Sequence, residues 1–369
     1  MLIILLTVLF LSACASDTPV SPSERLSGID VLSFYTDYDS YTRLRTNKVL
    51  NTEIPVNIFY KNENFTGKIR SAGSGSKYHP RWGFNVKLQD GFIEGFKRFN
   101  LSSQVFDRTG LNTILAIRLY GELGFPVHFV KPVFLRINSD DEGLYPLIER
   151  VDSSFFSRRG LEVYELYKLS FDADFSFDDD FVPEFVVDKE IPDNDNYTSL
   201  HELIHTLDTA GVRTINTTLK NDLDLENYLR YHALTSLLNN YDAFTNNFFL
   251  YKKTPDSPFQ VIPWDFDKCF STEPDVGAAG ENEIIFKLFQ SEEIKARYKN
   301  IVKDIANNYF NENFLSPIID ENAALIRDAY NLDPYLGKEG RYNFDNEISR
   351  LKEFVKNRFN NISIELENL

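Results

Sequence analysis

The chain has 369 residues, of which 43% are hydrophobic and 25% are charged. These values are typical of a folded globular protein and exclude extensive intrinsic disorder, while the length predicts two or three domains or lobes. Lys and Arg number 39 against 55 Asp and Glu, so the net charge of −16 argues against a general nucleic-acid binder. The two cysteines, Cys14 and Cys269, exclude a disulfide framework and a cysteine-rich zinc site.

The N-terminus has the features of a targeting segment. The apolar run from Leu2 to Leu11 is too short to span a bilayer but has the length of a signal-peptide core. It leads into Leu11-Ser12-Ala13-Cys14, which resembles the bacterial lipoprotein box, in which the cysteine is lipidated. We therefore expect residues 1–13 to be a signal peptide, Cys14 to carry a lipid anchor, and residues 14–44 to be a tether and lead-in. Ala15 after the cysteine favours the outer membrane or cell surface; the alternative is a buried strand that begins the chain.

Strand patterns dominate the first part of the chain. Hydrophobic residues recur at every second position in two segments, as expected for half-buried strands; they are Ile54, Val56, Ile58 and Tyr60, and then Trp82, Phe84, Val86 and Leu88. Two further strands are expected over 132–138 and 143–151, joined by a turn at Asp140-Asp141-Glu142.

Helical patterns follow. Asp107 is expected to cap a helix that runs to Leu123 and is ended by Gly124 and Pro126. Other helices are expected over 198–209, 223–239 and most of 281–361. A strand-rich part that precedes a helix-rich part indicates an α+β fold rather than an alternating doubly wound sheet. We expect two lobes, a smaller one over 45–152 and a helical one over 153–369.

The segment from Phe171 to Asn196 is rich in acidic residues, which raises the possibility of a calcium-binding loop. Counted from Asp172, however, position 6 is Phe177 rather than Gly and position 12 is Pro183 rather than Glu. We expect a solvated or substrate-facing loop instead.

The most informative stretch lies where the helix over 223–239 ends. Asp242 and Asn247 have the Asp-x-x-x-x-Asn spacing of a phosphotransferase catalytic loop. This chemistry requires a carboxylate that accepts the hydroxyl proton and a nearby amide oxygen that holds a metal ion. A hairpin is expected next, and Asp265 follows it in Pro263-Trp264-Asp265-Phe266-Asp267, where a kinase places its magnesium ligand. Each of these acidic residues, taken alone, is also consistent with a simple cap of a helix or strand.

These motifs resemble the spore-coat protein H (CotH) kinase family, and the resemblance covers most of the chain from about Val56. The matching stretches are 100–124, Gly143 to Asp152, Leu166-Tyr167-Lys168, Asn240 to Tyr251, and Ile262-Pro263-Trp264-Asp265. The resemblance implies an atypical protein-kinase-like fold and MgATP- or MnATP-dependent phosphorylation of Ser or Thr in proteins. It implies that Asp242 and Asp265 are catalytic and that Asp265, Asn247 and Asp267 hold the metal.

The nucleotide-binding side is less clearly marked in the sequence. Gly73-Ser74-Gly75-Ser76 stands where the family has a Gly/Ser-rich turn after an arginine, here Arg70, and glycines let backbone N–H groups approach phosphate. A plain connection between strands is the alternative. We take five residues as candidates for ATP binding, namely Arg70, Arg81, Lys87, Glu149 and Lys168, although Arg81 stands where the family usually has Lys.

A competing motif lies further along. His201-Glu202-Leu203-Ile204-His205 has the His-Glu-x-x-His pattern of zinc proteases, with Glu226 as a conceivable third ligand. The metzincin extension fails, and the apolar face of this segment is explained by a packing helix with histidines at its edge. A kinase is therefore the favoured reading, with a catalytically silent surface-binding protein or adhesin of the same fold as the alternative and a zinc protease as a remote one.

Overall fold

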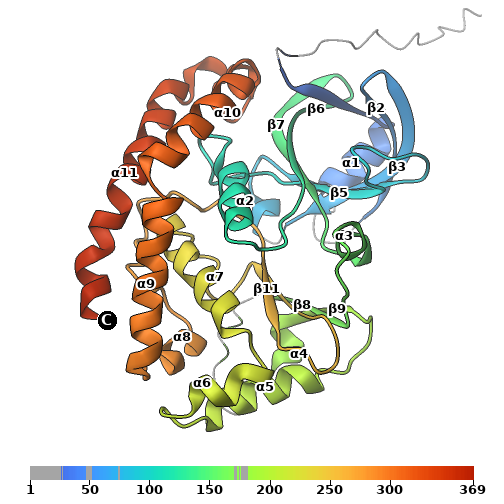
Figure 1. The fold of residues 1–369 in the computed structure, drawn as a ribbon. Coiled ribbons are helices and arrows are strands. Elements are labelled where there is room, and N and C mark those ends of the chain that lie inside the picture. Colours follow the sequence, from blue (N-terminus) through green and yellow to red (C-terminus); the bar gives the residue numbers. More distant parts are fainter. Residues whose placement is uncertain are drawn as a thin grey trace, which may run out of the picture.

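Seven strands close into a barrel and four others form a second sheet, with helices packed beside both (Figure 1). The computed structural model describes residues 26, 28–46, 52–73, 75–169, 173, 175 and 182–369. The predicted signal peptide, Cys14, Ser74 and most of the acidic stretch up to residue 181 lie outside these residues. Within them, no helix is long and apolar enough to cross a membrane.

The barrel has the strand order β1-β2-β3-β4-β5-β7-β6. Its strands are β1 (Asp30–Tyr35), β2 (Ile54–Tyr60), β3 (Glu63–Ala72), β4 (Gly83–Leu88), β5 (Arg98–Leu101), β6 (Val130–Ile137) and β7 (Asp140–Glu149). All neighbours are antiparallel except β1 and β6, whose parallel pairing closes the barrel. The lead-in expected up to residue 44 is wrong from Asp30 onward, because β1 is part of this barrel.

Alternation along the strands fills the barrel with hydrophobic side chains. In β2 the four residues expected to face the core are buried, and β4 buries Phe84, Val86 and Leu88 in the same way. The expected turn at 140–142 is wrong by a few residues, because Asn138 and Ser139 adopt positive φ and reverse the chain earlier. Asp140–Glu142 consequently belongs to β7.

The second sheet has the order β11-β10-β8-β9. Its strands are β8 (Glu165–Leu169), β9 (Val187–Ile191), β10 (Phe248–Lys252) and β11 (Gln260–Pro263), and the last two form the expected hairpin. The short helix α3 (Ser153–Arg158) follows β7 and precedes this sheet along the chain. Phe155 and Phe156 of α3 share a small core with residues of β8, β10 and β11.

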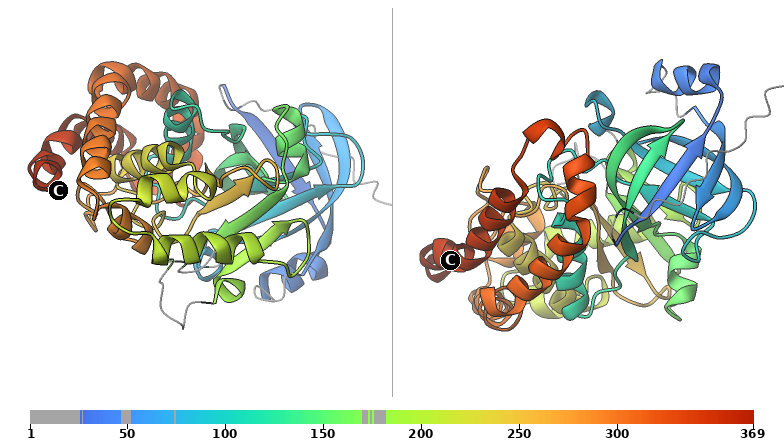
Figure 2. Two further views of the ribbon diagram at one scale, coloured as in Figure 1. Left: turned by 60° about the horizontal axis from the view of Figure 1, so that its bottom comes forward. Right: turned by 90° about the horizontal axis from the view of Figure 1, so that it is seen from above.

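The helices contribute many of the residues of the larger hydrophobic core. They are α1 (Tyr38–Thr46), α2 (Asn112–Glu122), α4 (Pro183–Val186), α5 (Thr198–Thr209), α6 (Ile215–Thr218), α7 (Leu225–Leu238), α8 (Glu283–Leu288), α9 (Glu292–Asn308), α10 (Glu312–Leu332) and α11 (Phe344–Asn368), with short 3₁₀ helices at Ser76–Tyr78, Leu219–Asn221 and Lys338–Gly340. Figure 2 shows α9, α10 and α11 on the side away from the barrel strands β2 and β3.

Helix α2 belongs to the helical core although it lies between barrel strands in the sequence. It starts at Asn112 rather than at Asp107, because the Asp107 carboxylate accepts hydrogen bonds from the backbone of Thr109, Gly110 and Asn112 and so shapes the preceding turn. Its apolar side chains join the same core as Phe134 and Leu144, which lie on the outer face of β6 and β7. The chain is thus a mixed α/β protein in which a strand-rich part leads into a helix-rich part.

Candidate functional site

A cleft of about 990 Å³ lies where the barrel faces the second sheet. One wall comes from β3, β4, β5 and β7 of the barrel. The other comes from β8, the loop after α7 and the segment after β11. Three of the acidic residues singled out in the sequence, Asp242, Asp265 and Asp267, line it together with Asn247 and Lys168. Residues far apart in the sequence are therefore brought to one place.

The loop after α7 positions the predicted base. The helix ends where Asn239 adopts the left-handed conformation, with φ of 52°. Its side-chain amide donates to the carbonyls of Ser271 and Pro274, so the start of the loop is fixed to a distant part of the chain. Within the loop, Nδ2 of Asn247 donates to Oδ2 of Asp242 at 2.8 Å. The Asp-x-x-x-x-Asn spacing therefore corresponds to a direct contact.

Backbone hydrogen bonds join this loop to the segment that carries Asp265. The N–H of Trp264 donates to the carbonyl of Asn247 at 3.0 Å, and the Asn240 side chain donates to the carbonyl of Asp265 at 3.1 Å. Asn247 and Asp265 both have positive φ, of 60° and 56°. A positive φ in a residue other than glycine costs about 1 kcal/mol and is often retained where function requires it.

The charged forms of two cleft carboxylates, Asp265 and Asp267, are disfavoured by burial and by neighbouring negative charge. Burial raises the pKa of Asp265, and the charge of Asp242 raises it further. Burial and the neighbouring Asp265 charge raise the pKa of Asp267 well above its usual range. Burial is the largest cause of both shifts, and the neighbouring negative charges add to it.

This donor set is suited to a hard divalent cation. Among the described residues no cluster of three or more His, Cys, Asp or Glu side chains forms a complete metal site. Mg²⁺ does not need one, since it is usually held by one or two carboxylates together with phosphate oxygens and waters. Asp265 and Asp267 supply carboxylates to the cleft. Asn247 supplies an amide, whose nitrogen is hydrogen-bonded to Asp242 and whose oxygen can act as a metal ligand. The residues present therefore fit the predicted magnesium ion.

The barrel wall of the cleft carries one continuous row of side chains. Strand register places Arg70 beside Asn85, Asn85 beside Asn100, and Asn100 beside Ile148, across β3, β4, β5 and β7. All four line the cleft. The row thus runs from a cationic residue through two amides to an apolar residue.

The two ends of this row differ in chemistry. Near Ile148, the buried ring of His128 packs edge-on against Trp264 at 4.8 Å between ring centroids. Its nitrogens lie 2.8 Å from the carbonyl oxygen of Pro263 and 3.3 Å from that of Glu149. At the other end the row approaches Gly73, whose φ of 88° favours glycine.

Three of the five predicted nucleotide ligands have other positions. Arg81 is buried in an ion pair with Asp333, 3.2 Å away, and donates to the carbonyl of Leu144. Lys87 is exposed near the far end of β4, away from the residues that line the cleft. The prediction that Arg81 and Lys87 bind the nucleotide is thus corrected, because their side of β4 lines the cleft at Gly83 and Asn85 but not at Arg81 or Lys87.

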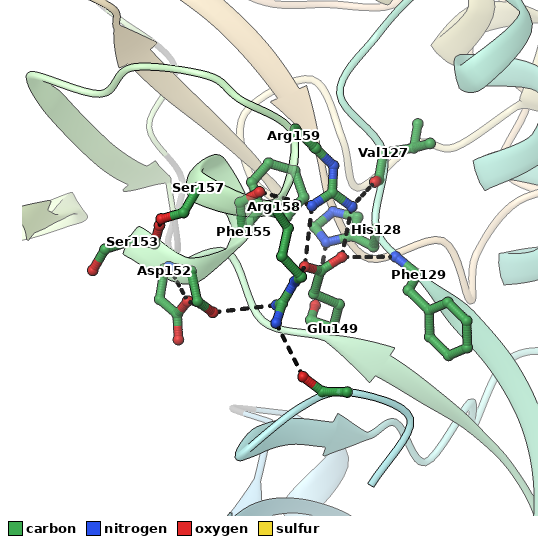
Figure 3. A network of polar contacts seen from close by, with 12 residues as sticks. Val127, His128, Phe129, Glu149, Asp152, Ser153, Phe155, Ser157, Arg158 and Arg159 are labelled. Atoms are coloured by element: carbon green, nitrogen blue, oxygen red, sulfur yellow. Dashed lines mark hydrogen bonds and ion pairs between the residues drawn. The ribbon is translucent and has the colours of Figure 1, made fainter. Parts of the chain in front are cut away.

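Glu149 is the third residue to be reassigned. Figure 3 shows Arg158 and Arg159 converging on its carboxylate, with shortest distances of 2.6 Å each. Burial raises the pKa of Glu149, but hydrogen bonds from Arg159, from the N–H of Phe129 and from Arg158 outweigh it and hold the pKa below its usual range. Glu149 therefore joins α3 to the barrel, while the other two candidates, Arg70 and Lys168, line the cleft.

The His-Glu-x-x-His motif lies away from the cleft on α5. His201 contacts Glu184 at 2.8 Å, and Glu202 and His205 are exposed. The conceivable third ligand, Glu226, is paired with Arg230 and Arg297 instead. The burial of Leu200, Leu203 and Leu207 on the opposite face explains the segment as a packing helix.

Several cleft residues were not singled out from the sequence. Lys268 forms an ion pair with Asp242, and Asn85, Asn100 and His128 line the barrel wall. Lys268 directly follows the Asp265-Phe266-Asp267 segment, which is the only local signal for it. The other three depend on strand register between distant segments, which a single sequence does not reveal.

One protein family and one relative match most of this chain. The CotH family, described as CotH kinase protein, matches residues 69–362. The chain is 25% identical over 283 residues to inner spore coat protein H of Bacillus subtilis (strain 168). The aligned region covers 72% of this chain and 77% of that protein.

Two solved structures are distantly similar. One is the HipA–HipB toxin–antitoxin system of Shewanella oneidensis MR-1 with its operator DNA, with 12% identity, a TM-score of 0.38, and coverage of 96% of this chain and 76% of that one. The other is the proinflammatory kinase CtkA of Helicobacter pylori, with 10% identity, a TM-score of 0.30, and coverage of 85% and 93%. The match to residues 69–362 spans most of the sequence and includes every residue of the cleft described above. The chain belongs to the CotH kinase protein family.

Proposed function

We propose that this protein is an atypical kinase that transfers the γ-phosphoryl group of ATP to Ser or Thr of protein substrates. The observation that carries the proposal is the hydrogen bond between Asn247 and Asp242, together with the backbone bond from Trp264 to Asn247. These contacts join a candidate base to a candidate metal-binding segment inside one cleft. Membership of a kinase family supports the same reading.

The proposed nucleotide position follows the row on the barrel wall. The adenine ring of the nucleotide lies at the apolar end, beside Ile148 and the rings of His128 and Trp264. Asn100 and Asn85 then face the ribose, and Arg70 lies on the phosphate side near Gly73. Lys168 approaches the phosphates from β8. The barrel and the helical part accordingly act as two lobes on either side of the nucleotide.

The proposed chemistry assigns one role to each loop residue. Asp265, Asp267 and the Asn247 amide oxygen would hold a Mg²⁺ or Mn²⁺ ion, which would neutralise phosphate charge. Asp242 accepts the proton of the Ser or Thr hydroxyl of the substrate, while the oxygen of that hydroxyl forms a bond to the γ-phosphorus of ATP. The bond between the γ-phosphorus and the oxygen that bridges it to the β-phosphate breaks, and ADP leaves.

The proposed location is the cell envelope. The apolar run before Leu11-Ser12-Ala13-Cys14 supports a lipid anchor at Cys14 on the outer membrane or cell surface. Mass spectrometry of the mature protein tests this, since a diacylglyceryl-modified Cys14 terminus is expected and an intact Met1 terminus contradicts it.

The experiment that tests the function is phosphate transfer from labelled ATP by the full chain. It is run with Mg²⁺, with Mn²⁺ and with chelator, and the acceptors are the protein itself and casein. Cation-dependent label on Ser or Thr is the expected result. Binding without transfer under every condition contradicts the proposal and favours a catalytically silent binding protein of the same fold.

A further inference from the structure

Lys268 is a cleft residue whose contacts give it a specific place in the site. Its Nζ lies 2.9 Å from Oδ2 of Asp242, and its side chain is only 18% exposed. An ion pair shielded from solvent in this way holds its two side chains in place more firmly than an exposed pair on the protein surface, which contributes little to stability.

Two aromatic rings limit where the Lys268 ammonium can lie. Nζ is 4.8 Å from the ring centroid of Tyr241 and 5.1 Å from that of Phe106. Tyr241 belongs to the loop of the candidate base, whereas Phe106 comes from the connection between β5 and α2. Cation–π attraction from two directions therefore fixes the charge between two segments that are distant in the sequence.

The same carboxylate oxygen receives a second donor. Nδ2 of Asn247 donates to Oδ2 of Asp242 at 2.8 Å, and the Lys268 ammonium forms its ion pair with the same oxygen. Two donors on one oxygen fix the rotation of the carboxylate. Both of these contacts are made at Oδ2 of the carboxylate.

We propose that Lys268 is a positioning residue for phosphoryl transfer, which holds the Asp242 carboxylate so that it meets the acceptor hydroxyl. This inference rests on the proposed kinase function. A general base contributes only when it lies within hydrogen-bond reach of the proton, and small misplacements reduce the rate strongly. Lys268 thus acts on the rate of transfer through Asp242 rather than on nucleotide affinity.

The test is a double-mutant cycle in the full chain, using Lys268→Met, Asp242→Asn and the double variant. The matched control is Lys352→Met. It removes an ion pair of 2.6 Å between Lys352 on α11 and Asp320 on α10, both outside the cleft. Melting temperature, kcat, and KM for ATP and for casein are measured for each protein. Lys268→Arg is included because it restores the charge and a hydrogen-bond donor.

We expect Lys268→Met to lower kcat by about 10-fold or more while KM for ATP changes by less than about 2-fold. Lys268→Arg recovers part of the loss, and Lys352→Met has wild-type kinetics. In the Asp242→Asn background, Lys268→Met adds no further loss, because both changes remove the same interaction.

Four results overturn the inference. Losses that multiply in the double variant show that Lys268 acts independently of Asp242. A lower melting temperature with unchanged kcat shows a purely structural ion pair. A normal kcat in Lys268→Met, beside an active wild type, removes the inference but leaves the proposed function intact, whereas a wild type without any transfer overturns both.

Discussion

Asn247 donates its side-chain amide to the Asp242 carboxylate at 2.8 Å, and this contact orients both residues. Because the amide nitrogen is engaged, the amide oxygen of Asn247 is directed away from Asp242 and is available for a cation. The carboxylate is held by the same bond. One hydrogen bond thus joins the proposed proton acceptor to the proposed metal ligand.

Replacing Asp265 tests the metal position. Asp265→Ala removes a carboxylate from the proposed cation site, so the charge of ATP is no longer offset there. We expect ATP with Mg²⁺ to raise the melting temperature of the wild type but not of this variant, and transfer to be lost as well. Asp256→Ala, in the exposed turn between β10 and β11, is the control and keeps both properties. Undiminished metal-dependent ATP binding by Asp265→Ala would exclude this residue from the site.

Replacing Arg81 tests its reassignment from nucleotide ligand to structural ion pair. Arg81→Met leaves the fully buried carboxylate of Asp333 without its charged partner, which costs about 3 kcal/mol or more of unfolding free energy. Arg327→Met removes an exposed pair with Asp345 and changes stability by less than about 1 kcal/mol. Urea unfolding and ATP titration check both variants. Weakened ATP binding by folded Arg81→Met with little loss of stability would restore the original assignment.

The buried histidine His232 predicts a loss of stability in acid. Burial lowers its pKa to about 4, against 6.5 for an exposed histidine. Between these values the unfolded chain binds the proton and the folded protein does not, so stability falls as pH drops below about 6.5. This one residue accounts for a loss of about 2 kcal/mol between pH 7 and pH 5.

Substitution separates this effect from other acid-sensitive groups. His232 packs among the rings of Tyr228, Phe244 and Tyr298, so His232→Phe preserves an aromatic core. Urea unfolding at pH 7 and pH 5 should show a smaller acid loss in this variant than in the wild type. His205→Gln, at an exposed position of α5, is the control and keeps the wild-type difference. An identical pH dependence in all three proteins would contradict the assignment.

The local parts of the fold could be predicted from the sequence. The period-two pattern from Ile54 to Tyr60 is a strand with that alternation, and the helix expected over 198–209 has those limits. These features depend on neighbouring residues alone. The start of α2 was misplaced because Asp107 acts five residues before the helix, through hydrogen bonds that also shape the intervening turn.

The long-range parts could not be predicted in the same way. β1 completes the barrel through parallel pairing with β6, about 100 residues later, and nothing in its short sequence specifies that partner. The sequence predicts Arg81 as a nucleotide ligand because it shares a polar strand face with Lys87. Its actual partner, Asp333, lies after α10 and is close only in the folded chain. The spacing of Asp242 and Asn247 was informative because both belong to one short loop.

The central claim is that Asp242 is the proton acceptor of a kinase, and the most direct test is phosphate transfer by Asp242→Asn. This change keeps the shape of the side chain but removes the acceptor, so we expect normal ATP binding, a near-normal melting temperature, and transfer reduced by about 10²-fold or more. Glu202→Gln, measured beside it, should transfer at the wild-type rate because Glu202 is exposed on α5. Near-wild-type transfer by folded Asp242→Asn would contradict the account.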